Sequence, residues 1–392
     1  VMVLLVLAGV VIYPFVSPTG RIYLGSVIAL HAIIALSLVV LTGWTGQVSL
    51  GQFGLAAVGA VVAGSLAARV GLPFWLSVPL ACLATAAIAV LIGIPALRLP
   101  GLYLAVATFA FAAAVRSVLF DPALFGWLLP EGQVHRPALP FLSFENERAM
   151  YFLSLAALIV ALVAVRNLRR SRFGRILIGL RDNEANAESA AVEPLRMKLT
   201  AFGFAGALTG FAGALLAFQQ RGVSGSGFEA QASIDLFVLS VIGGIGSIFG
   251  PLVGSGVING IGAALSGAPE VAAALAPSLA VVLLYLAPGG LISVAARVRD
   301  SVLRIVAQRN QMIVPSLFAD IDPQSLHLRL IPISASHNGG VERLRRRYDL
   351  ASMHADVREG DGLGGDAAAL SAAARAAEEG GGVETPSGDA PV

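Results

Sequence analysis

Residues 22–42 read IYLGSVIALHAIIALSLVVLT, an apolar stretch without Asp, Glu, Lys or Arg. A helix needs about 20 mostly apolar residues to cross the hydrocarbon core of a bilayer, and this stretch is long enough. Its one histidine, His31, stands alone, and a lone histidine in such a run is more often packed against neighbours than part of a proton relay. The stretch therefore predicts a transmembrane helix.

The rest of the chain continues this pattern. Hydrophobic residues make up 56% of the 392 residues and charged residues 13%, whereas a soluble domain carries about 25% charged residues; the mean hydropathy is +0.81. We expect an all-α, polytopic transmembrane helical bundle of about ten spans. The predicted spans are 2–16, 22–42, 52–69, 74–97, 101–120, 150–166, 199–218, 233–249, 251–267 and 271–288. The first is short, and the eighth and ninth abut at Gly250-Pro251, so a re-entrant or broken pair is the alternative for those two.

The distribution of arginine and lysine predicts the orientation of the spans. Short loops rich in these residues favour the cytoplasmic side. Two groups of basic residues lie between the sixth and seventh spans and after the tenth: Arg166, Arg169, Arg170, Arg172, Arg175, Arg181, Arg196 and Lys198, then Arg297, Arg299, Arg304 and Arg309. Ten spans then place both termini in the cytoplasm (N-in/C-in) and residues 121–149 outside.

The chain divides into a membrane domain at 1–292, with a cytoplasmic loop at 167–198, and a cytoplasmic tail at 293–392. The apolar runs stop near residue 293, and the end of the chain is rich in Ala, Gly and Glu, a composition typical of disorder. We interpret the tail as a largely disordered segment whose arginines face anionic headgroups. A docking tail, or the start of a fusion to another subunit, is the alternative.

Motifs for catalysis are missing from the sequence. It has no GxxxxGK[ST] phosphate loop, no HExxH, no GxSxG and no His/Cys cluster with the spacing of metal ligands. Ion-coupled carriers usually keep ionisable groups at membrane depth, and the predicted spans hold few. We therefore expect a non-catalytic transport subunit without a catalytic residue, metal site, cofactor or nucleic-acid partner, driven by another chain. A secondary carrier or channel and a membrane enzyme are the alternatives.

The cytoplasmic loop carries an amphipathic pattern. Ile176, Leu177 and Leu180 recur at helical spacing beside Arg175 and Arg181. A short helix lying flat under the bilayer would place its apolar side chains on the span ends and its charged side chains toward a partner. From the residues alone, a basic loop that only fixes topology explains the pattern equally well.

Two glycine-rich segments lie at the ends of apolar runs. They read GWTGQVSLGQFG at 43–54 and GGIGSIFGPLVG at 243–254. Irregular backbone at membrane depth survives only where protein or a watery cavity satisfies it, so both segments are candidates for pore-lining breaks. Close helix packing is the alternative role for each glycine. Their similar character in the two halves hints at repeated architecture.

Five motifs in order resemble one family. They are GQVSLGQFG at 46–54, PALRLPGLYLA at 95–105, SRFGR at 171–175, RDNE at 181–184 and GGIGSIFGP at 243–251. Together they resemble the branched-chain amino acid ABC transporter permeases of the LivM type, over roughly residues 20–292. Two features depart from the family: Glu188-Ser-Ala-Ala191 stands where Glu-Ala-Leu-Gly is common, and the tail from about 300 has no counterpart.

The resemblance implies a subunit of the bacterial cytoplasmic (inner) membrane that forms half of a translocation pathway for branched-chain amino acids. Its implied partners are a LivH-like second permease, two cytoplasmic ABC ATPases that bind ATP-Mg, and an extracytoplasmic solute-binding protein. Related permeases carry urea or short amides, so that substrate is the alternative. The implied ATPase-docking residues are Gly174, Arg175, Leu180, Arg181, Asp182 and Glu184. The implied translocation path comprises Gly46, Gln47, Ser49, Gly51, Gln52, Gly243, Gly244, Gly246, Ser247 and Gly250.

Overall fold

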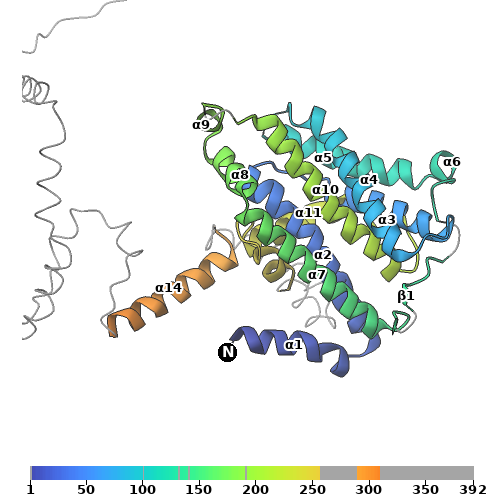
Figure 1. Cartoon of the computed structure of the whole chain (residues 1–392), viewed down its shortest axis with the longest axis horizontal. Coiled ribbons are helices and arrows are strands. Elements are labelled where there is room, and N and C mark those ends of the chain that lie inside the picture. The colour runs from blue at the N-terminus through green and yellow to red at the C-terminus, as the bar shows by residue number, and fades with distance from the viewer. Residues whose placement is uncertain are drawn as a thin grey trace, which may run out of the picture. The chain divides into compact units, whose positions relative to one another are not determined.

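The computed structural model describes residues 2–99, 101–130, 133–139, 142–189, 192–256 and 289–309. Their regular structure is almost entirely helical (Figure 1). The helices are α1 (Met2–Val16), α2 (Thr19–Leu38) with the π-helix η1 (Val39–Trp44), α3 (Gln52–Ala68), α4 (Phe74–Ala96), α5 (Leu102–Leu119), α6 (Pro122–Phe125), α7 (Glu147–Arg170), α8 (Arg172–Asp182), α9 (Glu184–Ser189), α10 (Pro194–Gln219), the 3-10 turn η2 (Gly225–Gly227), α11 (Ala230–Gly243) and α14 (Leu291–Arg309). The exception is an antiparallel ladder of β1 (Ala138–Leu139) and β2 (Leu142–Ser143), in which Ala138 faces Ser143.

Five helices of the described residues are long and apolar enough to cross a membrane. They are α2 continued by η1, α4, α5, α7 and α10, and they match the spans predicted at 22–42, 74–97, 101–120, 150–166 and 199–218. The span predicted at 52–69 corresponds to α3, which has 17 residues. This length is the lower limit for a span. The count of ten spans and the orientation stay predictions.

The remaining predicted spans differ from the described helices. The first forms α1, a helix of 15 residues that contains Pro14 and is shorter than a spanning helix requires. The eighth is not one continuous helix, because α11 ends at Gly243 and helical structure resumes only at Gly250. This interruption agrees with the broken alternative. The ninth is described only to residue 256, and the tenth lies outside the described residues.

The boundary drawn at 292/293 falls inside a helix. Helix α14 runs from Leu291 to Arg309, so the first residues assigned to the tail are helical. Residues 310–392 lie outside the described part of the chain, and the disorder expected of them stays a prediction.

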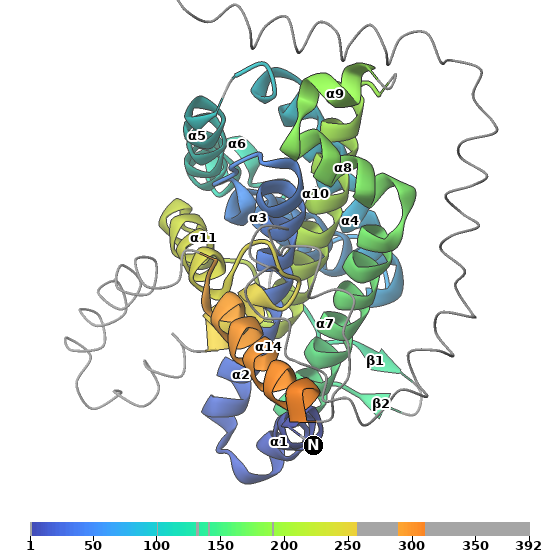
Figure 2. The same cartoon turned by 90° about the vertical axis from the view of Figure 1, so that its left-hand side faces the viewer.

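Helix α10 occupies the centre of the bundle, between α2, α3 and α4 (Figures 1 and 2). In its most apolar window 78% of the residues are buried, against 22% in α5. Glycines permit this close packing: a Cβ at Gly213 would overlap the carbonyl oxygen of Ala56, and a Cβ at Gly59 would lie 2.6 Å from the Cα of Gly210. Small residues serve helix association in lipid because they let backbones approach.

The peripheral helices expose large apolar side chains. Leu83 on α4 is 67% exposed, Leu102 on α5 is 77% exposed and Val160 on α7 is 61% exposed. Water would disfavour such surface by roughly 25 cal/mol per Å². These faces are therefore suited to lipid or to another membrane subunit.

The connecting segments gather at two ends of the bundle. Helices α8 and α9 mark one end, here called the α8 end; α6 and the β1–β2 ladder mark the opposite end (Figure 1). At the opposite end Arg69 donates to the carbonyl oxygen of Gly126 at 2.6 Å, and Arg221 pairs with Glu145 at 3.0 Å. Loops that lie far apart in sequence are thus held together there.

Candidate translocation and docking sites

The first glycine-rich segment interrupts the helices at the end of α2. The last turns of that helix widen into the π-helix η1, and residues 46–51 have no regular structure before α3 begins at Gln52. Gly46 has φ +72°, a conformation that glycine adopts readily. Within lipid, the backbone polar groups of such a segment must find partners in the protein.

Hydroxyl groups from two other helices supply partners for this backbone. The Leu50 N–H donates to Thr108 Oγ1 on α5 at 2.9 Å, and the Phe53 N–H donates to Ser233 Oγ on α11 at 3.1 Å. Both hydroxyl residues are buried. The conformation of the break is therefore stabilised by hydrogen bonds to α5 and α11.

Gln52 anchors the end of the break to the central helices. Its Oε1 lies 2.9 Å from Ser37 Oγ on α2 and 2.9 Å from Thr209 Oγ1 on α10, while its Nε2 donates to Ser49 Oγ at 3.3 Å. The Gln52 side chain is 1% exposed. Thr209 lies near the middle of α10, so Gln52 and the start of α3 lie against the middle of that helix.

The second glycine-rich segment forms another break, and the two breaks meet. The chain between Gly243 and Gly250 is irregular, and Gly244 has φ +109°, which only glycine tolerates well. A Cβ at Gly43 would overlap the carbonyl oxygen of Ile245. Segments about 200 positions apart thus touch through backbone, and a larger residue at 43 would separate them.

The other predicted path residues take defined places in these breaks. The Gln47 N–H donates to the Leu41 carbonyl at 3.1 Å, and the Gln47 carbonyl accepts from Thr42 Oγ1 at 3.0 Å. The Ser247 N–H donates to the Gly244 carbonyl at 3.0 Å. Gly51 packs against Thr108, and Gly243 packs against Gly250. Gly246 is exposed.

A tight turn joins α7 to the predicted docking helix α8. Ser171 caps α8 by accepting from the Gly174 N–H at 3.2 Å and donates to the Leu168 carbonyl at 2.6 Å. A Cβ at Gly174 would overlap that same Leu168 oxygen. The structure therefore supplies the reason for glycine at 174.

Helix α8 is amphipathic as predicted. Leu177 and Leu180 are buried, whereas Arg175 and Asp182 are exposed. Two predicted docking residues also make contacts within the chain. Arg181 Nη1 donates to the carbonyl oxygen of Gly43, and Glu184 pairs with Lys198 at 2.7 Å. Helix α8 thus contacts η1 directly before the first break.

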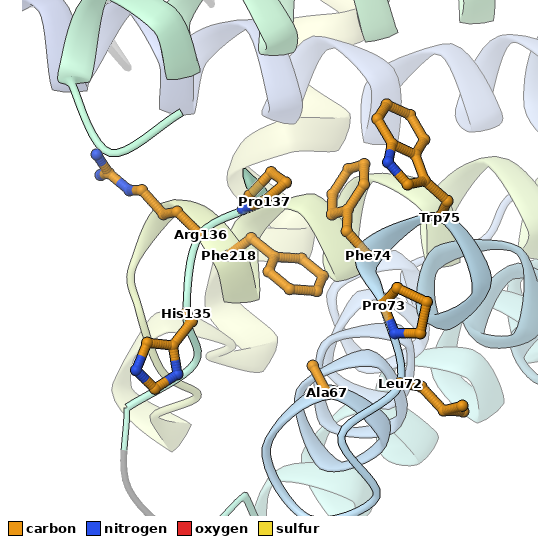
Figure 3. Close-up of a pocket in the computed structure, with 9 residues that line it drawn as sticks. All are labelled: Ala67, Leu72, Pro73, Phe74, Trp75, His135, Arg136, Pro137 and Phe218. Carbon is orange, nitrogen blue, oxygen red and sulfur yellow. The ribbon is translucent and has the colours of Figure 1, made fainter. Parts of the chain in front are cut away.

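A cavity of about 200 Å³ opens at the opposite end, near Phe74, Trp75 and Phe218 (Figure 3). The rings of Phe74 and Phe218 meet edge to face with centroids 4.9 Å apart, whereas the Arg136 guanidinium is directed away from them. That guanidinium is nearly buried and pairs with Glu147 at 2.6 Å; it also donates to the carbonyl of Gln219 at 3.0 Å. Arg136 therefore ties the loop to α7 and α10, and the hollow is lined by His135 and Arg136 as well as by apolar side chains.

Sequence reasoning missed the hydroxyl residues that hold the first break: Ser37, Thr108, Thr209 and Ser233. An isolated Ser or Thr in an apolar run was the available signal, but such residues usually bond to a carbonyl of their own helix. Thr209, for example, also donates toward the Ala205 carbonyl at 2.8 Å.

His31 packs edge to face on Phe53, with ring centroids 5.3 Å apart, as a packed histidine would. Among the described residues no three His, Cys, Asp or Glu side chains gather as a metal site requires.

Residues 21–288 match the family described as branched-chain amino acid transport system / permease component. The chain belongs to this family. It is 33% identical over 272 residues to the high-affinity branched-chain amino acid transport system permease protein LivM of Salmonella typhimurium, covering 63% of this chain and 64% of that protein. The LivM protein of Escherichia coli is 33% identical over 270 residues, covering 63% of each chain. This permease thus aligns with slightly under two thirds of its relatives' length. No solved structure matches it.

The resemblance found in the sequence motifs is thereby confirmed. The family match contains both glycine-rich breaks and α8, whereas α1 and α14 lie outside it. The features singled out as candidate sites are therefore parts of the shared permease region.

Proposed function

We propose that this permease forms half of the translocation pathway of an ATP-binding cassette importer in the bacterial cytoplasmic membrane. A second, LivH-like permease supplies the other half. Two cytoplasmic ATPases bind ATP-Mg and drive the pair of permeases, an ATPase docks on α8, and an extracytoplasmic binding protein delivers the solute at the opposite end. The exposed apolar faces of α4, α5 and α7 suit both lipid and a second permease.

The contact between Arg181 and Gly43 carries this proposal. It joins the amphipathic helix α8 to η1, directly before the first break. Movement of α8 by a docked ATPase would therefore reach the break through one hydrogen bond. A channel or carrier that works without an ATPase does not need a contact that links a docking helix to the break.

Branched-chain amino acids are the proposed solute, and urea or a short amide is the alternative. The names of the two relatives support the amino acid. The choice is tested by uptake of labelled leucine, isoleucine and valine in competition with urea and acetamide.

Assembly tests the docking assignment. The permease is purified with the products of its neighbouring genes, and the retained ATPase and the ATP-driven uptake are measured. Arg175→Glu reverses an exposed charge on α8 and should reduce ATPase retention and uptake about tenfold, as a loss of about 1.4 kcal/mol implies. Arg148→Glu makes the same change at the opposite end and should leave ATPase retention intact. Equal behaviour of the two variants would overturn the assignment.

A further inference from the structure

A second cavity, of about 400 Å³, opens between α5 and α11. Its lining runs along α5 from Phe109 to Ser117 and includes Arg116; Glu229 and Gln231 line it from the start of α11. Ligand pockets typically have about 300–1,000 Å³, so the space suits a small solute. The cavity is separate from the aromatic hollow of Figure 3.

Two opposite charges face each other at this cavity. Arg116 Nη2 lies 3.1 Å from Glu229 Oε1, and each side chain is 49% exposed. A guanidinium carries five N–H donors and a carboxylate can accept about four hydrogen bonds, so a single contact leaves both groups able to bind a further partner. A ligand with one negative and one positive group is complementary to the pair.

The surroundings of the pair favour water over lipid. Asp235 lies one turn beyond Gln231 on the same face of α11, and it is exposed. Gln231 donates to it at 3.2 Å. Charged groups within membrane segments almost always face a watery cavity or the bundle interior. This face of α11 is therefore suited to a wet path.

The helices that form the cavity also contact the first break. Thr108, which holds Leu50, is the residue next to Phe109 in the cavity wall and lies eight residues before Arg116, about 12 Å along α5. Ser233, which holds Phe53, lies one turn after Glu229. The two helices that form the cavity are thus the two that hold the break by its backbone.

We propose that this cavity is the entry site for a zwitterionic α-amino acid, with Arg116 binding its carboxylate and Glu229 its ammonium group. Phe109 and Ala113 form the apolar wall for the side chain. The inference rests on the proposed function and deepens it, because such a site favours an amino acid over uncharged urea or amides.

Uptake by the complete importer in vesicles tests the site. Arg116→Gln and Glu229→Gln should each lower leucine uptake per assembled complex about tenfold or more, as expected for a lost charge-assisted hydrogen bond. The exchange variant Arg116→Glu with Glu229→Arg keeps an ion pair but reverses its direction, so it should not restore uptake. Glu145→Gln, in the exposed Arg221 pair at the same end, is the matched control and should leave uptake unchanged.

The outcomes separate the possible explanations. Restored uptake in the exchange variant would show a structural ion pair and overturn the inference, as would unchanged uptake in both single variants. In either case the proposed function would stand. Absence of ATP-driven leucine uptake by the wild-type importer would overturn the proposed function itself and the inference with it.

Phosphatidylethanolamine also carries a zwitterionic headgroup. The measurements are therefore repeated in vesicles of phosphatidylglycerol, which lack that headgroup, and the loss in Arg116→Gln should persist there. If the loss vanished in those vesicles, the pair would bind a lipid headgroup, and the assignment to the amino acid would be wrong.

Discussion

Gln52 shows how single residues make an irregular segment tolerable in a membrane. Its amide reaches Ser37, Ser49 and Thr209, so one side chain joins α2, the break and α10. Interhelical hydrogen bonds of this kind average about 0.6 kcal/mol in membrane proteins. These hydrogen bonds matter here mainly because together they fix the position at which α3 begins.

Removal of both hydroxyls beside Gln52 should cost more than the sum of the single removals. Thr209→Val and Ser37→Ala should each lower the free energy of unfolding by about 0.6 kcal/mol. The double variant leaves Gln52 Oε1 without a donor, and a buried unsatisfied group costs about 1–3 kcal/mol. Unfolding of the purified permease in mixed micelles measures the difference. Ser26→Ala is the control, since Ser26 donates to Ile22 in its own helix; strictly additive losses would contradict the shared-acceptor geometry.

Gly174 is where a single methyl group should disturb docking. Gly174→Ala would force Cβ against the Leu168 carbonyl, and overpacking of this kind costs about 1–3 kcal/mol. The turn from α7 into α8 should open, and ATPase retention should fall about tenfold. Gly179→Ala on the same helix is the matched control, because nothing lies within 4 Å of its added Cβ. Equal retention by both variants would refute this role for Gly174.

At the scale of elements, the sequence predicts the long helices, but for the breaks it predicts only the glycines and not the residues that bond to them. Apolar length alone located α2, α4, α5, α7 and α10, because a spanning helix must satisfy its backbone within itself. The breaks were recognised by their glycines. Their partners were missed, since the bond from Thr108 to Leu50 joins residues 58 positions apart. The prediction of a continuous eighth span was wrong because apolar composition does not reveal that the backbones of Gly243 and Gly250 lie in contact.

The packing of α10 predicts a sharp contrast between two glycines. Gly213→Ala should lower the free energy of unfolding by about 1–3 kcal/mol, because its Cβ would push α10 away from the Ala56 carbonyl on α3. Gly20→Ala, near the start of α2, has nothing within 4 Å of the added Cβ and should be neutral or slightly stabilising. Unfolding in mixed micelles compares the two. If both variants unfolded alike, the close approach of α10 to α3 would be refuted.

At the scale of the whole molecule, the two ends of the bundle have different proposed functions: ATPase docking at the α8 end and solute entry at the opposite end. The α8 end carries the proposed docking helix and its hydrogen bond to η1, directly before the first break. The opposite end carries the Arg116–Glu229 pair and the Arg136 cluster. A solute entering between α5 and α11 would therefore meet the first break from one side while an ATPase acts on it from the other. That scheme requires the two ends to lie on different sides of the membrane.

Chemical labelling of single cysteines should reveal which side is which. Cys82 is the only cysteine in the chain, so Cys82→Ser gives a background without thiols. In that background Trp127→Cys places a thiol at the opposite end, where Trp127 is 68% exposed, and Asp182→Cys places one on the exposed face of α8. The basic loop around α8 should be cytoplasmic. A membrane-impermeant maleimide should therefore label the thiol at 127 in intact spheroplasts and the thiol at 182 only after permeabilisation. The reverse pattern would invert the orientation, and equal labelling of both thiols in intact spheroplasts would contradict the assignment of the two ends to opposite sides.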